Sequence, residues 1–205
     1  MSLRPENPVA HSAAARSPSA AEKGEYSPEE RALLLELARD SIAATLEPRE
    51  LSLTPPSQHL AEPRAAFTTL YYHGRLRGCV GHVRAVASLW ATVADTARAA
   101  AFEDTRFDPV TSEEVPHLQV SLSILSPLKP IRAQEVEVGR HGLLISQHGR
   151  RGLLLPQVPV EYGWDRLTFL EETCHKAGLP PDAWRKGATL EAFTAEVFGD
   201  RESEE

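Results

Sequence analysis

The sequence predicts an α+β fold in which antiparallel or mixed sheets are flanked by helices. Helical and strand patterns are interspersed without the regular strand–helix–strand repeats of a parallel sheet. Residues 66–82 and 143–155 each contain two short strand patterns around a glycine-containing turn. Three segments that begin at Ser27, Ser88 and Asp165 carry apolar residues at helical spacing. We therefore expect helices packed on antiparallel hairpins.

Composition narrows the class of protein. Hydrophobic residues make up 41% of the chain and charged residues 25%, which is typical of a globular protein with a substantial core. The formal net charge of -7 argues against general nucleic-acid binding. Two cysteines cannot build a disulfide framework, so a cytoplasmic location is expected. Neither a membrane-spanning apolar run nor a signal-peptide core is expected.

Both ends of the chain are expected to lie outside the folded domain. The stretch His11–Ala21 has no large apolar side chain that could offset its ordering entropy. We expect a disordered tail at residues 1–25 and a flexible tail at 199–205. Residues 26–198 would then form one domain, which could consist of two subdomains.

The first two helices have clear start signals. Ser27–Glu30 is a capping box with proline at the first helical position, and Pro48 ends the helix that follows. The three prolines of residues 51–64 predict an irregular connector. Ser88 opens the second helix, which should end near Phe102 and pack its alanine-rich end closely on a sheet.

Five strands are predicted before the last helix. Ala66–Tyr72 and Leu76–His82 form the first hairpin. Leu118–Leu125 alternates apolar and polar residues and is predicted as a half-buried strand. Leu143–Ser146 and Gly152–Leu155 form the second hairpin.

The last long helix is predicted to begin after Asp165 and to stop at Gly178. A short helical turn should follow at Trp184, and Leu190–Phe198 should form one closing strand. The side chains of the last helix that we expect to face inward are Leu167, Phe169, Leu170 and Cys174.

The segment Leu76–His82 has the composition of a binding or catalytic site. Cys79 lies between Gly78 and Gly81 and follows Arg77. Glycines permit positive φ and close approach of a ligand, and successive N–H groups around them can form an anion-binding nest. Arginine can hold a carboxylate or phosphate with two parallel bonds, and such a setting favours a reactive thiolate. The alternative is a glycine-rich hairpin with a buried, inert cysteine.

Each predicted hairpin lies in a stretch that contains no aspartate or glutamate, although the protein as a whole is acidic. We call these two stretches the acid-free windows. Four arginines and two histidines lie between Glu62 and Asp95, and three arginines and two histidines lie from Arg140 to Val160. We expect the two hairpins to line one pocket for an anionic ligand, with two solvated basic turns as the alternative. The ligand-binding candidates are Arg77, Gly78, Gly81, Asp104, Arg106, Arg151 and Gln157.

A cysteine nucleophile needs a base and a group that orients that base. His82 and His141 are equal candidates for the base of Cys79. Residues i and i+3 of a strand point to opposite faces, so His82 can serve Cys79 only if a glycine bulge turns the chain. The carboxylates that could orient the base are Asp104 and Glu161.

Asp104 and Arg106 lie in a polar loop at residues 104–109 and have two interpretations. They could pair and brace the loop, or Asp104 could present its carboxylate near Cys79. Neither a complete set of zinc ligands nor a nucleotide-binding motif is found, so we expect no metal and no cofactor. Cys174 is expected in the core.

The motif Leu-Arg-Gly-Cys-Val-Gly at residues 76–81 resembles the Leu-Arg-Gly-Cys-Ile-Gly signature of the AMMECR-type domain family. The resemblance continues through Phe102–Val110, Gly152–Val158 and Cys174–Leu179. It covers roughly Ser27–Phe198, and the motifs are specific in combination. The resemblance implies an α+β fold of two intimately packed subdomains.

The family usually has Asp-Pro-Arg-Phe where this chain has Thr105 after Asp104, which keeps the charged pair but loosens the turn. The chain looks most like the bacterial branch called AmmeMemoRadiSam system protein A. That branch is associated with a Memo-like, dioxygenase-related protein and a radical S-adenosylmethionine (SAM) protein. The resemblance does not imply a defined molecular activity.

Two functional hypotheses follow. The first is an enzyme, or a component of an enzyme complex, that handles a small anionic or nucleotide-like ligand and uses Cys79 as nucleophile. The second is a non-catalytic ligand- or protein-binding domain that works with Memo-like and radical SAM partners. RNA binding is a weaker third hypothesis, because Tyr71 and Tyr72 are the only adjacent aromatic pair.

Overall fold

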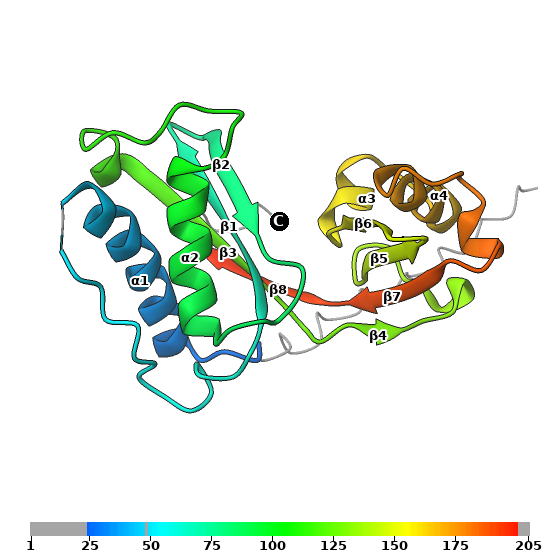
Figure 1. Ribbon diagram of the computed structural model, residues 1–205, viewed down its shortest axis with the longest axis horizontal. Coiled ribbons are helices and arrows are strands. Elements are labelled where there is room, and N and C mark those ends of the chain that lie inside the picture. The colour runs from blue at the N-terminus through cyan, green and yellow to red at the C-terminus, as the bar shows by residue number, and fades with distance from the viewer. Residues whose placement is uncertain (1–23, 48, 201–205) are drawn as a thin grey trace, which may run out of the picture.

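A computed structural model describes residues 24–47 and 49–200. The expected N-terminal tail lies outside the described residues except for its last two positions. The expected C-terminal tail lies outside them from residue 201 onward. The α+β class is confirmed, because helices flank two four-stranded sheets whose strand pairs are all antiparallel. Figure 1 shows that the sheets belong to two lobes.

The first lobe is a sheet with strand order β2-β1-β3-β8, covered on one face by two helices (Figure 1). Its helices are α1 (Pro28–Leu46) and α2 (Leu89–Phe102), and a 3₁₀ helix at Val115–His117 precedes β3. The strands are β1 (Ala65–Tyr72), β2 (Arg75–Gly81), β3 (Leu118–Leu125) and β8 (Ala195–Gly199).

The helix start signals of the sequence are confirmed. The Ser27 hydroxyl accepts a bond of 3.2 Å from the backbone N–H of Glu30, whose carboxylate accepts one of 3.1 Å from the Ser27 N–H. The Ser88 hydroxyl caps α2 through the backbone N–H of Ala91 at 3.2 Å. The helices and the sheet enclose the larger apolar core, which includes Leu34, Ile42, Leu70, Leu89, Val93 and Leu122.

The second lobe is a sheet with strand order β4-β7-β5-β6. Its strands are β4 (Lys129–Pro130), β5 (Gly142–Gln147), β6 (Arg150–Leu154) and β7 (Thr189–Phe193). Its α-helices are α3 (Gln157–Glu161) and α4 (Arg166–Lys176), and 3₁₀ helices lie at Ala133–Glu135 and Ala183–Arg185. The sequence patterns did not predict β4 or α3, which are too short to show a period.

Asp165 caps α4 as predicted, through a bond of 2.8 Å from the backbone N–H of Thr168. Phe169, Leu170 and Cys174 are buried. The inward orientation predicted for Leu167 is wrong, because this residue in the first turn is 43% exposed. The helical pattern therefore holds only after the first turn.

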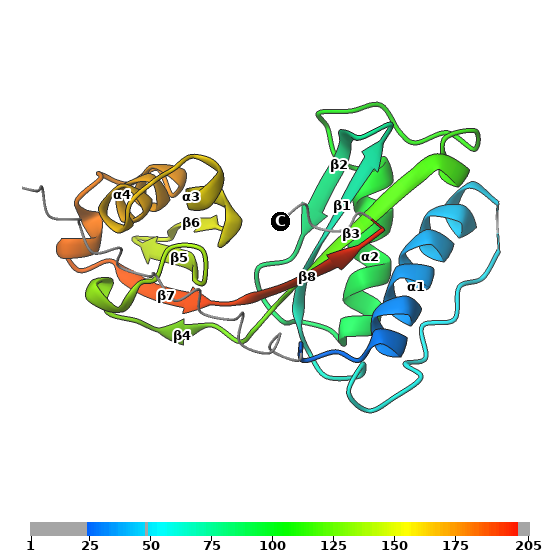
Figure 2. The same cartoon turned by 180° about the vertical axis from the view of Figure 1, so that it is seen from behind.

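The prediction of one closing strand at Leu190–Phe198 is also wrong. Thr194 separates β7 from β8, and the two strands belong to different sheets. At the crossing, Ser126 N–H donates to the Thr194 carbonyl and Thr194 N–H donates to the Ser126 hydroxyl, both at 2.9 Å. A two-stranded ribbon therefore runs from β3 and β8 into β4 and β7, which Figure 2 shows as the connection between the lobes.

The lobes also meet through side chains beside this ribbon. Ala65, Leu125 and Phe193 are buried together, and Phe67 of β1 packs on the same cluster as Leu153 of β6. Because Phe67 extends from the face of the first sheet that lacks helices, that face is turned toward the second lobe.

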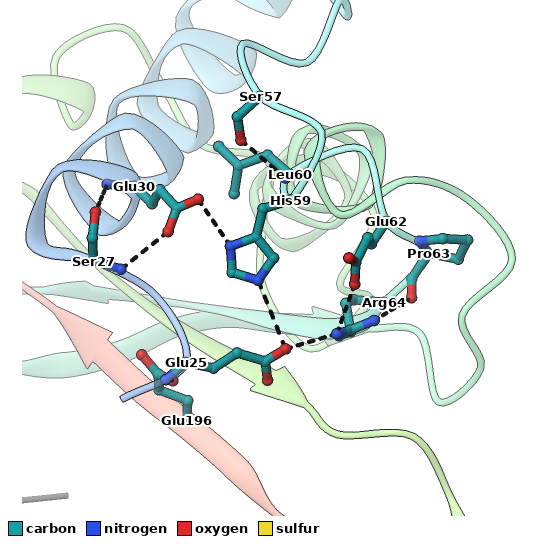
Figure 3. A network of polar contacts seen from close by, with 10 residues as sticks. All are labelled: Glu25, Ser27, Glu30, Ser57, His59, Leu60, Glu62, Pro63, Arg64 and Glu196. Atoms are coloured by element: carbon teal, nitrogen blue, oxygen red, sulfur yellow. Dashed lines mark hydrogen bonds and ion pairs between the residues drawn. The ribbon is translucent and has the colours of Figure 1, made fainter. Parts of the chain in front are cut away.

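The segment before α1 is fixed beside β8 by a polar network (Figure 3). Glu25 N–H donates to the Glu196 carboxylate at 2.6 Å, and the Glu25 carboxylate lies 2.7 Å from Arg64 Nη2. His59 Nδ1 lies 2.9 Å from the Glu30 carboxylate and its ring stacks on Tyr26, whose pKa burial raises. Residues 24–26 are therefore held beside β8.

Candidate functional site

The Cys79 thiol lies on the face of the first sheet that the helices leave uncovered. Cys79 pairs in register with Thr69 of β1. The next residue of β1, Thr68, is buried toward α2, where its hydroxyl lies 2.8 Å from the Thr96 hydroxyl. Since side chains alternate along a strand, Thr69 and Cys79 point the other way. The Thr69 hydroxyl donates to Cys79 Sγ at 3.3 Å, and no histidine or carboxylate bonds to that sulfur among the described residues.

The structure does not bring His82 to the Cys79 thiol. The pairing with β1 runs without a shift from Cys79 to Gly81, so the bulge that would turn His82 toward the sulfur is missing there. The irregularity of this strand pair lies at Arg77 instead. His82 Nε2 is 2.8 Å from the Asp95 carboxylate on α2, and this bond lowers the pKa of Asp95.

The glycines of the motif serve packing and do not form the expected nest. Neither Gly78 nor Gly81 has a positive φ. A Cβ at Gly78 would lie 2.0 Å from the carbonyl oxygen of Ala100 in α2, and one at Gly81 would lie 2.2 Å from the Phe67 ring. The glycines therefore let α2 and an aromatic ring approach β2 closely.

Asp104 closes the outer edge of β2. Its carboxylate accepts a bond of 2.9 Å from the backbone N–H of Cys79 and is gripped by Arg106 through bonds of 2.9 and 2.7 Å. Arg106 Nη2 also lies 3.5 Å from the Cys79 carbonyl oxygen. The Asp104 side chain is only 7% exposed, and the bond from Arg106 holds its pKa far below the ordinary range. Asp104 thus braces the loop, and its contact with Cys79 is to the backbone.

Arg77 holds a carboxylate of the protein itself. Its Nε and Nη2 donate to Glu114 at 2.8 and 3.0 Å, and Nη2 also lies 3.3 Å from the Pro109 carbonyl oxygen. The bond from Arg77 lowers the pKa of Glu114. The remaining nitrogen, Nη1, is buried and has no hydrogen-bond partner among residues 24–47 and 49–200.

A polar pocket of about 430 Å³ lies beside this arrangement. Arg77 and Arg106, two of the predicted ligand-binding residues, line it together. The other lining residues are Thr105, Phe107 and Asp108. This pocket adjoins the loop that closes the β2 edge, so it is the candidate site nearest to the Cys79 motif.

The structure does not bring the two basic hairpins to one pocket. The two hairpins belong to different sheets. Figures 1 and 2 both show β5 and β6 in the second lobe and β2 in the first. Arg150 Nη1 donates to the Gly178 carbonyl at 2.6 Å, and Arg151 is exposed beside it in β6. The first acid-free window is also less basic than its sequence suggests, because Glu25 and Glu114 from outside it pair with Arg64 and Arg77.

The remaining candidates lie elsewhere. His141 accepts a bond of 3.0 Å from the Glu137 N–H and lines a pocket of about 360 Å³ with Phe193. Gln157 and Glu161 are the two ends of α3 and line a pocket of about 280 Å³ opposite β8. No hydrogen bond joins these side chains to Cys79 in the described part of the chain.

Sequence reasoning missed Thr69 and Glu114. Thr69 could be found only from the strand register, which the shift at Arg77 hides. Residues 111–114 have the sequence of a capping box, and Glu114 does accept a bond of 2.9 Å from the Thr111 N–H. Its second role as the partner of Arg77 has no signal in the sequence.

None of the described residues forms a group of three or more histidine, cysteine, aspartate or glutamate side chains that could hold a metal ion. Within the same residues, no helix is both long and apolar enough to cross a membrane.

Comparisons with known proteins identify relatives over most of the chain. The model of the AMMECR1 family matches residues 35–198. A Methanopyrus kandleri protein is 39% identical over 188 residues, which cover 86% of this chain and 91% of that protein. A Methanosarcina barkeri protein is 41% identical over 180 residues, which cover 82% and 89% of the two chains.

A solved structure shares the fold. The crystal structure of an uncharacterized Pyrococcus horikoshii protein has 38% sequence identity and a TM-score of 0.75. The match covers 82% of this chain and 90% of that chain. The α+β architecture is thus common to both proteins.

Proposed function

The chain belongs to the AMMECR1 family, and we propose that it is a non-catalytic binding domain for a small ligand that bears a carboxylate or phosphate group. The ligand would occupy the pocket between the edge of β2 and the loop of residues 104–108. Cys79 would then belong to the wall that supports the pocket.

The observation that carries this proposal is that two arginines, Arg77 and Arg106, line one polar pocket. The Nη1 of Arg77 is a buried donor without a partner among the described residues, which costs on the order of 1–3 kcal/mol, and a ligand that draws this group toward the pocket would recover that cost. Arg106 adds a second cation, because it lines the same pocket and its Nη1 has no hydrogen bond among the described residues.

The charges of the pocket restrict the ligand. Arg106 already balances Asp104 and Arg77 already balances Glu114, while Asp108 adds a further carboxylate to the lining. A ligand with several negative charges would be repelled by these acids. A monocarboxylate, or a phosphate monoester with about two charges on a larger neutral body, therefore fits better than a polyphosphate with three or more charges.

The surroundings of the thiol favour binding over nucleophilic catalysis. A cysteine nucleophile is activated by an adjacent base or by a lowered pKa. Cys79 Sγ has the Thr69 hydroxyl as its hydrogen-bond partner, whereas His82 pairs with Asp95 on the other face of the sheet. The described residues thus leave the thiol without a base.

The test is calorimetric titration with orthophosphate, AMP and acetate. We expect saturable binding of at least one probe and about tenfold weaker binding in Arg106→Gln, which corresponds to roughly 1.4 kcal/mol. The matched control is Arg98→Gln, another arginine of the first lobe that pairs with acids on the surface. An absence of saturable heat for all three probes, or equal weakening by both variants, would contradict the proposal.

The enzyme alternative keeps one supporting observation. Cys79 is only half buried, so a reagent in solvent can reach its thiol. If Cys79 is a nucleophile, iodoacetamide at neutral pH should modify it well before Cys174. Cys174 is fully buried, and this burial raises its pKa. Modification of Cys174 at the same rate would sink this alternative.

The resemblance to AmmeMemoRadiSam system protein A adds partner proteins to the proposal. A Memo-like protein and a radical SAM protein would act with this domain on the bound ligand. Co-sedimentation of the three purified proteins, with and without AMP, measures whether they associate. Separate sedimentation under both conditions would remove the partners and leave the ligand site unaffected.

A further inference from the structure

We propose that the outer edge of β8 binds an extended peptide of a partner protein by β-strand addition. β8 is the last strand of the first sheet and pairs with β3 alone. An edge strand presents unpaired N–H and C=O groups, which another extended chain can complete. This inference is independent of the ligand pocket beside β2.

The hydrogen bonds at both ends of β8 show which residues face outward. Asp200 N–H donates to the Val120 carbonyl at 3.0 Å, and Thr194 accepts from Ser126 N–H at 2.9 Å. Backbone groups of successive residues alternate in direction across an antiparallel pair. The even-numbered residues of β8 therefore bond to β3, and the residues that face outward are Ala195, Val197 and Gly199.

The outward backbone groups of β8 are free in the part of the chain that the structure describes. No hydrogen bond from another described element reaches the N–H or C=O groups of Ala195, Val197 or Gly199. The N-terminal segment approaches nearby, but Glu25 bonds to the Glu196 side chain and not to the strand backbone. Within residues 24–47 and 49–200, the backbone of this edge is thus open.

A groove runs along this edge. Two pockets of about 280 and 610 Å³ share the lining residues Gly139, Ala195 and Val197. The second lobe supplies a wall opposite the strand, with Arg140 in the larger pocket and Val160 of α3 in the smaller one. Gly24, Glu25 and Arg31 of the first lobe also line the larger pocket. Because this wall stands opposite the strand, the space suits one extended chain better than the sheet of a second copy.

The side chains in the groove define the chemistry of the peptide. Val197 is 45% exposed and Val160 is 59% exposed, and both line the smaller pocket. A paired strand places alternate side chains on the same face as Val197. The peptide should therefore carry apolar residues at every second position, with polar residues between them.

The probe is an acetylated, amidated hexapeptide in which valine alternates with threonine and lysine. The control peptide has the same composition with its valines adjacent. In the free protein, hydrogen exchange should be fast at the Val197 and Gly199 amides and slow at Glu196 and Phe198. The alternating peptide should slow exchange at Val197 and Gly199 at least tenfold, and the control peptide should not.

Variants of the protein and of the peptide test the backbone contact. Val197→Pro removes an N–H that β3 does not use, so it should abolish peptide binding, whereas Val197→Ala should weaken it only a few-fold. If Val197→Pro fails to fold by circular dichroism, Val197→Lys replaces it and should weaken binding at least tenfold. N-methylation of every second peptide residue removes the N–H donors from one edge of the extended peptide only. It should abolish binding when the methylated residues are those that face β8, and not when they are the residues between them.

Three outcomes would overturn the proposal. Binding of the alternating peptide without protection at Val197 and Gly199 would place it elsewhere. Equal binding of the two peptides, or no binding of either, would show that the edge does not select an extended strand. A concentration-dependent dimer in sedimentation that Val197→Pro dissociates would assign the edge to a second copy of this chain.

Discussion

The two outer edges of the first sheet differ in whether their outward backbone groups have hydrogen-bond partners. At β2, the Asp104 carboxylate takes the outward N–H of Cys79, and Arg106 lies against the Cys79 carbonyl. At β8, the outward groups of Val197 have no partner among the described residues, and a groove runs beside them. One edge is closed by the protein itself, and the other is open among the described residues.

This difference bears on how the cysteine motif is understood. Unprotected edges promote unwanted pairing between chains, and proteins block them with charged side chains and loops. The charged residues around Cys79 perform that task at β2, which explains why they are paired internally. The residues that the sequence singles out as a site therefore also serve the architecture.

The largest expected effect comes from Gly78, which holds β2 close to α2. In Gly78→Ala the new Cβ would lie 2.0 Å from the Ala100 carbonyl oxygen, so strand and helix must separate. We expect a loss of about 3 kcal/mol in the free energy of unfolding, measured by urea denaturation. Leu76→Ala is the control, because Leu76 is exposed on the same strand. A loss below 1 kcal/mol for Gly78→Ala would show that β2 can move away from α2.

The second prediction opens the closed edge. Asp104→Ala leaves the Cys79 N–H without its partner and frees Arg106, so we expect a loss of about 2 kcal/mol. Hydrogen exchange at the Cys79 amide should become fast. Asp108→Ala, an exposed acid in the same loop, is the control and should change stability by less than about 0.5 kcal/mol. Unchanged protection of Cys79 in Asp104→Ala would mean that another group closes this edge.

The third prediction concerns pH. The folded-state pKa of Asp104 lies below its ordinary value of 3.8, chiefly because of the bond from Arg106. Its stabilising contribution is therefore fully present above that ordinary value and is lost as pH falls through the folded-state pKa. The stability difference between wild type and Asp104→Ala should shrink by about 1 kcal/mol between pH 6 and pH 3. A difference that stays constant over this range would exclude the carboxylate charge as the cause.

The smallest effect on stability is expected at the open edge. Val197→Lys should change the free energy of unfolding by less than about 0.5 kcal/mol, because lysine is well tolerated on edge strands and Val197 is 45% exposed. The same variant should still lose the proposed peptide binding. A destabilisation comparable with that of Asp104→Ala would show that the β8 edge is covered within the protein.

Local sequence signals predicted most of the elements of the first lobe. The capping box at Ser27 and the cap at Ser88 set the starts of α1 and α2, and the alternation over Leu118–Leu125 gave β3 with its observed bounds. These signals succeed because caps and strand alternation depend on residues only a few positions apart. The closing strand failed because nothing local at Thr194 indicates that the chain changes sheets.

The sequence by itself determined the family and the fold class, since motifs and patterns suffice for these. It left the pairing of Asp104 with Arg106 as one of two interpretations, between which the structure decided. Only the tertiary structure decided the partners of the motif: Glu114 reaches Arg77, Asp95 takes His82, and the second basic hairpin lies in the other lobe. The physical reason is that electrostatic and hydrogen-bond partners are chosen by distance in space. Carboxylates from outside an acid-free stretch can therefore pair with its cations once the chain folds, as Glu114 does with Arg77.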